Sequence, residues 1–122
     1  MNDEAKKKIL VVDDEEDVRT YLVTLLEDNG YETAQATDGD VAFRMVHENP
    51  PDLITLDLQM PNETGTRFFR TLMKDKEHRG IPVIVISGLA GRHLAMSEPV
   101  AVFDKPVEKD QLLEKIRETI GE

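Results

Sequence analysis

Five short apolar runs alternate with amphipathic segments along this chain, and this alternation limits the fold more than any other feature does. The runs occupy residues 9–12, 32–36, 53–56, 82–86 and 100–103. Four of them are nearly continuous Val, Ile and Leu, which is typical of strands buried on both faces of a parallel sheet. The run ETAQA at residues 32–36 is more polar and belongs near a sheet edge.

Apolar residues at helical spacing lie between the runs and predict the connecting helices, at residues 18–26, 41–46, 68–73 and 112–120. Residues 88–99 read GLAGRHLAMSEP, and their two glycines, serine and proline favour a short or irregular fourth helix. Strand, helix and strand units connect with right-handed parallel crossovers. We therefore predict an α/β fold of the (βα)5 type, a doubly wound, flavodoxin-like, five-stranded parallel sheet in the order 2-1-3-4-5.

Composition restricts the class of the protein and its partners. The 122 residues are 39% hydrophobic and 33% charged, a balance typical of one folded domain, for which we expect a flexible lead-in at residues 1–7 and no output domain. The net charge of -10 opposes direct binding to nucleic acid or to an anionic membrane. Because the chain has no cysteine, no signal peptide and no membrane-length apolar run, we expect it to be cytoplasmic.

Polar side chains follow four of the five runs, each at the point where the apolar run stops. Asp13 and Asp14 follow the first run, Asp57 the third, Ser87 the fourth and Lys105 the fifth. The carboxyl ends of parallel strands share one edge of the sheet, and ligands bind there at the switch in strand order. Three crowded carboxylates repel one another unless a divalent cation and a lysine offset them. We therefore predict a Mg2+ site beside an acceptor carboxylate.

Asp57 is the candidate nucleophile, because its strand should lie beside the first one and its carboxylate should face Asp13 and Asp14. A carboxylate held near Mg2+ can attack phosphorus and form an aspartyl phosphate. Ser87 would supply a hydroxyl donor and Lys105 a positive charge for the phosphoryl oxygens. Each residue taken alone is more often a cap, a turn former or a surface residue, so the prediction depends on the whole set.

Other polar residues are expected to be structural. We expect Glu15 and Glu16 to cap the helix that follows the acidic pair. His47, His78 and His93 lie in polar surroundings without metal-ligand spacing to one another, so we expect surface residues rather than ligands.

From residue 8 to residue 120 the chain resembles the receiver domain of the bacterial response regulators. The positions that carry the resemblance are Asp13, Asp14, Asp57, Met60-Pro61, Gly65, Ser87 and Lys105-Pro106. The resemblance implies that Asp57 accepts phosphate from the phosphohistidine of a histidine kinase or phosphotransfer protein. It also implies a Mg2+ ion bound directly by Asp14, Asp57 and the main-chain carbonyl of Gln59, and by Asp13 through water. A cis Lys105-Pro106 peptide is implied as well.

The implied function is a phosphorylation-dependent signalling receiver in a two-component or phosphorelay system that signals by protein contact. It would not be an enzyme acting on an external substrate, since it would catalyse only its own phosphorylation and autodephosphorylation. The residues do not specify the kinase or the downstream target.

Three departures from the family pattern concern the readout. Val102 stands where the family usually has a Tyr or Phe that swings inward on activation, and Phe103 cannot replace it because neighbouring strand residues point to opposite faces. Ser87 and Lys105 are 18 positions apart, about one helical turn fewer than is usual. Gln59 sits two positions after the acceptor, where a side chain affects water access to the phosphate. We therefore expect the signal to leave mainly through Ser87 and residues 88–92.

Several alternatives remain. The chain could be a receiver-fold binding module with lost or weak phosphorylation, or a receiver fragment of a larger regulator or hybrid kinase. A haloacid-dehalogenase-type phosphatase would need an Asp where Glu15 stands. A flavodoxin-like electron carrier would need a Ser, Thr and Gly loop to bind phosphate, and the acidic DDEED would repel one.

Overall fold

The computed structural model describes residues 6–88 and 99–121. Its strands are β1 (Lys8–Val12), β2 (Glu32–Ala36), β3 (Leu53–Leu56), β4 (Val83–Ser87) and β5 (Ala101–Asp104). Its helices are α1 (Glu16–Asp28), α2 (Gly39–Glu48), α3 (Thr64–Lys74) and α4 (Lys109–Ile120), with a 3-10 turn, η1 (Pro61–Glu63), before α3. The expected short fourth helix falls at residues 89–98, outside the described residues, so α4 is the helix that follows β5.

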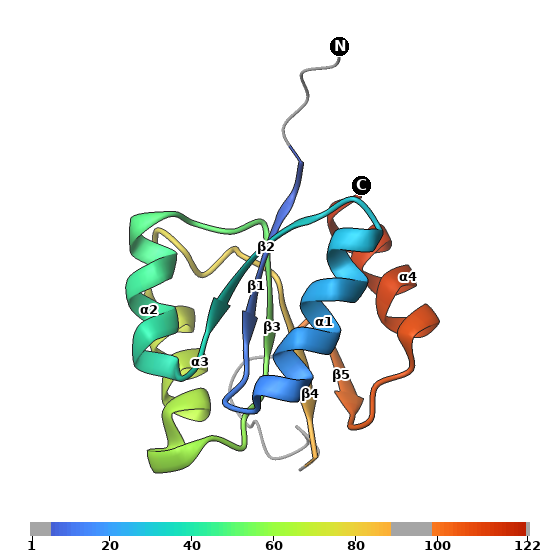
Figure 1. Ribbon diagram of the computed structural model, residues 1–122. Coiled ribbons are helices and arrows are strands. Elements are labelled where there is room, and N and C mark those ends of the chain that lie inside the picture. The colour runs from blue at the N-terminus through green and yellow to red at the C-terminus, as the bar shows by residue number, and fades with distance from the viewer. Residues whose placement is uncertain (1–5, 89–98, 122) are drawn as a thin grey trace.

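The five strands are all parallel and lie in the order β2-β1-β3-β4-β5, which confirms the predicted topology. Helices α2 and α3 cover one face of this sheet, and α1 and α4 cover the other (Figure 1). Within residues 6–88 and 99–121, no helix is long and apolar enough to cross a membrane.

The alternation of side chains along each strand builds a separate apolar core on each face. On β1, for example, Leu10 packs in the core under α2 and α3, whereas Ile9 and Val11 pack under α1 and α4. Burying a side chain of this size contributes about 1.5–3 kcal/mol. The edge strand β2 is more exposed than β1, as its polar sequence predicts.

Main-chain hydrogen bonds continue past the strand ends and hold the residues that follow them. The N–H of Asp13 donates to Ala36 O at 3.2 Å, and the N–H of Asp57 donates to Val12 O at 3.0 Å. The N–H of Lys105 likewise donates to Ser87 O at 3.2 Å. The polar residues at this edge are therefore fixed by the sheet itself.

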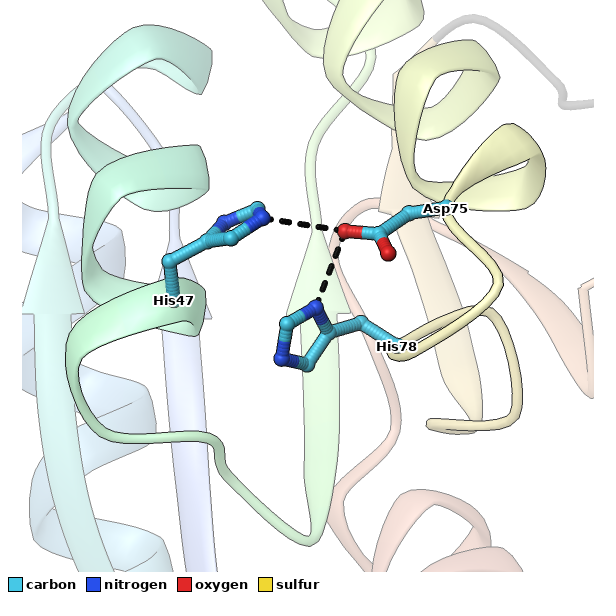
Figure 2. Close-up of side chains that lie close together, drawn as sticks. All are labelled: His47, Asp75 and His78. Atoms are coloured by element: carbon cyan, nitrogen blue, oxygen red, sulfur yellow. Dashed lines mark hydrogen bonds and ion pairs between the residues drawn. The ribbon is translucent and has the colours of Figure 1, made fainter.

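A cluster at the carboxyl ends of α2 and α3 corrects one expectation from the sequence. His47, Asp75 and His78, here called the histidine cluster, point toward one another between the two helices (Figure 2). The side chain of His47 is 41% exposed, but that of His78 is only 10% exposed. The prediction of surface residues is therefore wrong for His78, whereas His47 is exposed but has a ring nitrogen close to the atoms of Asp75 and His78 that could bind a metal. His93 lies outside the described residues.

Candidate functional site

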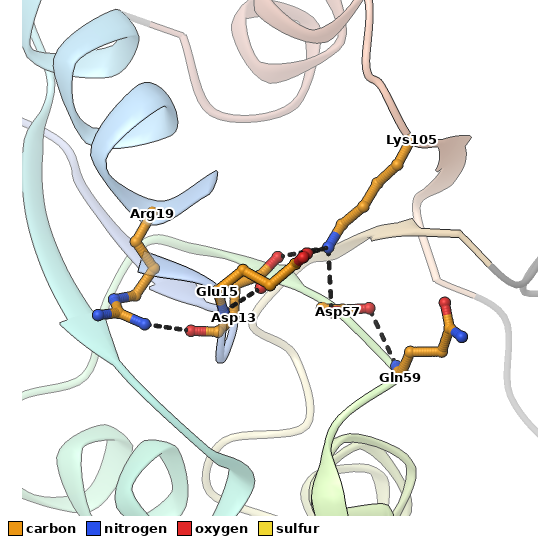
Figure 3. Close-up of polar contacts among 6 residues, drawn as sticks. All are labelled: Asp13, Glu15, Arg19, Asp57, Gln59 and Lys105. Carbon is orange, nitrogen blue, oxygen red and sulfur yellow. Dashed lines mark hydrogen bonds and ion pairs between the residues drawn. The ribbon is translucent and has the colours of Figure 1, made fainter. Parts of the chain in front are cut away.

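Asp13, Asp57 and Lys105 converge at the carboxyl ends of β1, β3 and β5 (Figure 3). Val12 and Leu56 are register partners on neighbouring strands, so Asp13 and Asp57, one residue further on, lie side by side. Both aspartates are 2% exposed, whereas Asp14 is exposed. Parallel register alone therefore places two buried carboxylates next to each other.

Lys105 is the shared partner of the carboxylates at this edge. Its Nζ lies 2.9 Å from Asp13 Oδ2, 3.1 Å from Asp57 Oδ2 and 2.8 Å from Glu15 Oε1. The peptide from Lys105 to Pro106 is cis, as the family resemblance implies. The acceptor site below means Lys105, the three carboxylates that it contacts (Asp13, Glu15 and Asp57) and Asp14.

Glu15 does not have the role expected from the sequence. It occupies the N-cap position of α1, but its side chain makes no capping hydrogen bond. Its carboxylate binds Lys105 instead, and its N–H donates to Asp13 Oδ1 at 2.8 Å. The acidic loop therefore folds back on itself because the lysine attracts Glu15 away from the helix end. Glu16 remains in the first turn, where negative charge is favourable.

The acceptor site has more negative charge than its one lysine can balance. Four carboxylates and one ammonium give a formal charge of -3, since Glu15 adds to the three aspartates. Burial raises the pKa of Asp13, although hydrogen bonds from the N–H of Glu15 and from Lys105 act against this. Burial lowers the pKa of Lys105, but its hydrogen bonds to the three carboxylates outweigh burial and raise it above its usual range. The hydrogen bond from Lys105 lowers the pKa of Glu15.

Carboxylate oxygens of Asp13, Asp14 and Asp57 lie within 4.8 Å of one another and form a possible cation site. Asp57 accepts hydrogen bonds at both oxygens, from the N–H of Gln59 to Oδ1 at 2.9 Å and from Lys105 to Oδ2. The donor set is oxygen only, with excess negative charge. Such a set suits a hard divalent cation such as Mg2+ better than a softer metal.

The loop between β3 and α3 explains why Gly65 is part of the family pattern. A Cβ atom at Gly65 would lie 2.4 Å from the main-chain oxygen of Asp57, so only glycine lets α3 begin this close to the acceptor. Within the described residues, Asn62 and Glu63 are the non-glycine residues with positive φ, at 60° and 57°. Asn adopts this left-handed region readily, but a long side chain such as that of Glu63 is strained there, and such strain often occurs near functional sites.

Sequence reasoning missed Arg19, which supports the acidic loop from α1. Its Nη1 donates to Asp13 O at 2.8 Å, and its Nε donates to Gln35 Oε1 at 3.2 Å. Arg19 lies one helical turn after Glu15, with its N–H bonded to Glu15 O. That spacing from the acidic loop is the only signal in the sequence that could have identified it.

The remaining predicted residues, Ser87 and Gln59, follow the neighbouring strands β4 and β3 along the same edge of the sheet. Ser87 is fully buried at the carboxyl end of β4, one residue beyond the predicted end of that strand. A Cβ at Gly88 would lie 2.9 Å from Gln59 Oε1, so the Gln59 side chain reaches the start of the next loop. Apart from Gly88, residues 88–92 lie outside the described part of the chain.

The β5 positions agree with the sequence analysis. Val102 is 41% exposed, whereas Phe103 packs against the core under α1 and α4. The two side chains therefore lie on opposite faces, and Phe103 does not replace the aromatic residue that is missing at position 102.

Comparison with known proteins identifies relatives over most of the chain. A sequence model for the response regulator receiver domain matches residues 9–117. The polar-differentiation response regulator DivK of Brucella ovis is 30% identical over 120 residues, covering 95% of this chain and 98% of DivK. The CAI-1 autoinducer sensor kinase/phosphatase CqsS of Vibrio cholerae is 36% identical over 117 residues, covering 91% of this chain but only 17% of CqsS.

Solved structures agree with the sequence comparison. The signal receiver domain of a signal transduction histidine kinase from Syntrophus aciditrophicus superposes with a TM-score of 0.86 at 28% identity. The match covers 93% of this chain and 89% of that domain. Similar domains therefore occur both as nearly whole proteins and as parts of kinases.

Proposed function

This chain belongs to the response regulator receiver domain family, and we propose that it is a signalling receiver controlled by phosphorylation of Asp57. The observation that supports this proposal best is the placement of Asp57. Its carboxylate is buried at a strand end, next to Asp13 and within 3.1 Å of Lys105. A nucleophile needs this combination of fixed position and nearby charge.

In the proposed reaction, a carboxylate oxygen of Asp57 attacks the phosphorus of a phosphohistidine on a partner protein. A P–O bond to Asp57 forms while the P–N bond breaks, and the histidine nitrogen leaves with the bonding electrons and takes up a proton. Lys105 would donate to the phosphoryl oxygens, because its Nζ already contacts the acceptor carboxylate. Ser87 would add a hydroxyl donor from the end of β4.

We propose that Asp13, Asp14, Asp57 and the main-chain carbonyl of Gln59 hold Mg2+. The excess of carboxylates over lysine at this edge supports the assignment. The ion would offset the repulsion between the carboxylates and the incoming phosphoryl group. Asp13 and Asp57 are equally buried, and both are more buried than Asp14. The contact of Asp13 with Lys105 keeps its carboxylate oriented toward the acceptor.

The proposed partners are a histidine kinase or phosphotransfer protein on the input side and a protein target on the output side. The chain would act on no external substrate and would catalyse only its own phosphorylation and dephosphorylation. The similarity to DivK and to part of CqsS is compatible with either a separate regulator or a domain of a larger protein.

Intact-mass measurement tests the acceptor. With Mg2+ and a small phosphodonor such as acetyl phosphate, the protein should gain the mass of one phosphate group. The variant Asp57→Asn should gain none, and the matched control Asp75→Asn, at the opposite end of the sheet, should label like the native protein. Labelling of Asp57→Asn would contradict the assignment of the acceptor.

Metal removal tests the second part of the proposal. A chelator should stop phosphorylation, and Asp14→Ala should weaken Mg2+ binding and slow phosphorylation by about 100-fold or more. Asp14 is exposed, so this variant should fold normally. An unchanged Mg2+ titration in Asp14→Ala would place the metal elsewhere.

One observation favours a second candidate, a binding module with lost or weak phosphorylation. The family's aromatic residue is replaced by Val102, which is 41% exposed. A native protein that takes no phosphate in the mass experiment but still binds a family kinase would support this alternative.

A further inference from the structure

The histidine cluster lies far from the acceptor site, at the opposite edge of the sheet. Helices α2 and α3 run antiparallel to the strands, so their carboxyl ends lie beside the amino ends of the strands (Figure 1). His47 is in the last turn of α2, Asp75 directly follows α3, and His78 lies in the turn after it. No step of the proposed phosphorylation uses these residues.

Three ligand atoms converge in this cluster. Asp75 Oδ2 lies 3.0 Å from His47 Nε2 and 2.9 Å from His78 Nδ1 (Figure 2). The three atoms all lie within 4.8 Å of one another. The His47 and His78 rings are 4.6 Å apart between centroids, and Phe43 packs 4.3 Å from the His47 ring. The imidazoles are therefore held in place by ring packing as well as by the carboxylate.

The contacts of His47 require a positive charge between its ring and Asp75. Its Nδ1 lies 2.9 Å from Phe43 O, and a carbonyl oxygen can only accept, so Nδ1 carries the proton. In the neutral ring the lone pair on Nε2 then points at Asp75 Oδ2, which also has only lone pairs to offer. Such a contact at 3.0 Å is repulsive unless a positive charge lies between the two atoms. That charge can be a second proton or a metal ion.

We propose that the histidine cluster binds Zn2+ through His47 Nε2, Asp75 Oδ2 and His78 Nδ1. A metal-bound histidine typically donates its other ring N–H to a main-chain carbonyl, which is what His47 does with Phe43 O. Zinc bonds of about 2.0–2.1 Å place tetrahedral ligands about 3.3 Å apart. The observed separations of 3.0 Å and 2.9 Å from Asp75 Oδ2 need widening by only a few tenths of an ångström.

Two imidazoles and one carboxylate select the class of metal. Nitrogen ligands suit Zn2+ and similar transition metals, whereas Mg2+ and Ca2+ prefer oxygen alone. The fourth position of a tetrahedral site would be filled by water, reached past His47, whose side chain is 41% exposed. Bound zinc would tie the end of α2 to the segment after α3. The chain would then have two metal sites of different chemistry at opposite edges of one sheet.

Zinc titration of the full chain tests the proposal, with thermal unfolding and the nitrogen signals of the imidazoles as readouts. Zn2+ should raise the unfolding temperature and shift His47 Nε2 and His78 Nδ1, while His47 Nδ1 keeps its bonded proton. His47→Ala should weaken Zn2+ binding by at least about 100-fold, because loss of a mere hydrogen-bonded neighbour of a ligand costs about 10–100-fold. This residue is exposed enough for the variant to fold.

The control is Asp14→Ala, which alters the acidic site and should leave the Zn2+-induced shifts of the His47 and His78 nitrogen signals unchanged. If Zn2+ binding survives in His47→Ala but falls in Asp14→Ala, the ion binds at the acceptor site and the proposal is wrong. If about a tenfold excess of Zn2+ moves neither the unfolding temperature nor the imidazole signals, the cluster is a hydrogen-bonded contact between helices and the proposal is also wrong. Both results are independent of whether Asp57 is phosphorylated.

Discussion

The two edges of the sheet differ in the charge of the group that their polar side chains share. At the carboxyl edge, one ammonium, Lys105 Nζ, is shared by three carboxylates within 3.1 Å. At the amino edge, one carboxylate oxygen, Asp75 Oδ2, is shared by two imidazoles within 3.0 Å. The first edge therefore has unbalanced negative charge, whereas the second pairs one anion with two groups that can be neutral or positive.

This difference shows that the fold tolerates electrostatic repulsion at the carboxyl edge of the sheet. Buried like charges repel, and their proximity is maintained by strand register rather than by their own attraction. Such a site changes readily when a cation or a phosphoryl group arrives, because small changes in charge alter which contacts are favourable. The histidine cluster instead links α2 to the segment after α3 with complementary contacts. We expect the loss of a carboxylate at the two edges to change the pH dependence of the free energy of unfolding in opposite directions.

Removal of the shared cation should have the largest effect. Without Mg2+, Lys105→Ala should lower the free energy of unfolding by about 2–3 kcal/mol, because Asp13 and Asp57 are left buried without a positive partner. Urea denaturation measures this difference. Added Mg2+ should stabilise the variant more than the native protein, since the ion replaces part of the missing charge.

The control for this measurement is Lys115→Ala, which removes a lysine from an exposed pair with Glu118 on α4. It should change the free energy of unfolding by less than about 0.5 kcal/mol. Equal stability of Lys105→Ala and the native protein without Mg2+ would mean that the acceptor site has no unbalanced charge in the folded state.

Close packing at the acceptor edge gives the next largest effect. Gly65→Ala places a methyl group 2.4 Å from Asp57 O in the native backbone, so the loop must move at a cost of about 1–2 kcal/mol. Phosphorylation by a small phosphodonor should slow as well, because Asp57 moves with the loop. Gly80→Ala is the matched control, since its added methyl meets nothing within 4 Å. Equal phosphorylation rates in the two variants would mean that phosphorylation does not depend on the position of this loop.

The pH dependence of stability should differ in sign between the edges. The hydrogen bond from His78 lowers the pKa of Asp75, so its contribution is complete above the unfolded pKa of about 4 and is lost as pH falls through the lower folded pKa. Burial raises the pKa of Asp13, so the folded protein holds that proton more tightly. The Asp13 carboxyl therefore favours folding least above its raised pKa.

Unfolding of Asp75→Asn and Asp13→Asn across a pH series checks this sign. The deficit of Asp75→Asn should shrink below about pH 4. Relative to the native protein, Asp13→Asn should gain stability as pH rises above that value. Parallel curves for the two variants would contradict the charge comparison between the edges.

The fold and the outline of the acceptor site could be predicted because both depend on local patterns. Each apolar run has the length of a strand, and strand order then brings Asp13 and Asp57 together without any knowledge of side-chain contacts. The predicted end of β4 at residue 86 is one residue early, because Ser87 pairs with Asp104 in the sheet although it is polar. Side-chain type alone does not show that a hydrogen-bonded ladder continues.

The unpredicted contacts join residues from separate elements. Glu15 and Lys105 are 90 positions apart, and nothing in the acidic loop shows which of its carboxylates turns toward the lysine. Asp75 and His78 have the readable spacing of i and i+3, but His47 joins them only because α2 packs beside α3. Such contacts depend on the geometry of helix packing. The periodicity of the sequence predicts which face of a helix is buried, but not which two side chains meet.

The smallest expected effect concerns backbone strain, which also differs between the edges. Near the amino edge, positive φ angles fall on glycines, Gly30 after α1 and Gly121 after α4. In the loop after the acceptor they fall on Asn62 and Glu63, and the second of these has a long side chain that does not favour this region. Glu63→Gly should relieve about 1 kcal/mol of strain, of which the greater freedom of glycine in the unfolded chain offsets about half. The expected net gain is about 0.5 kcal/mol, or a rise of about 1–3 °C in unfolding temperature. Glu114→Gly, at an exposed position within α4, should instead lose about 1 kcal/mol because its backbone is already helical. If Glu63→Gly loses stability as well, the left-handed conformation at Glu63 is not strained, and the contrast between the edges is one of charge alone.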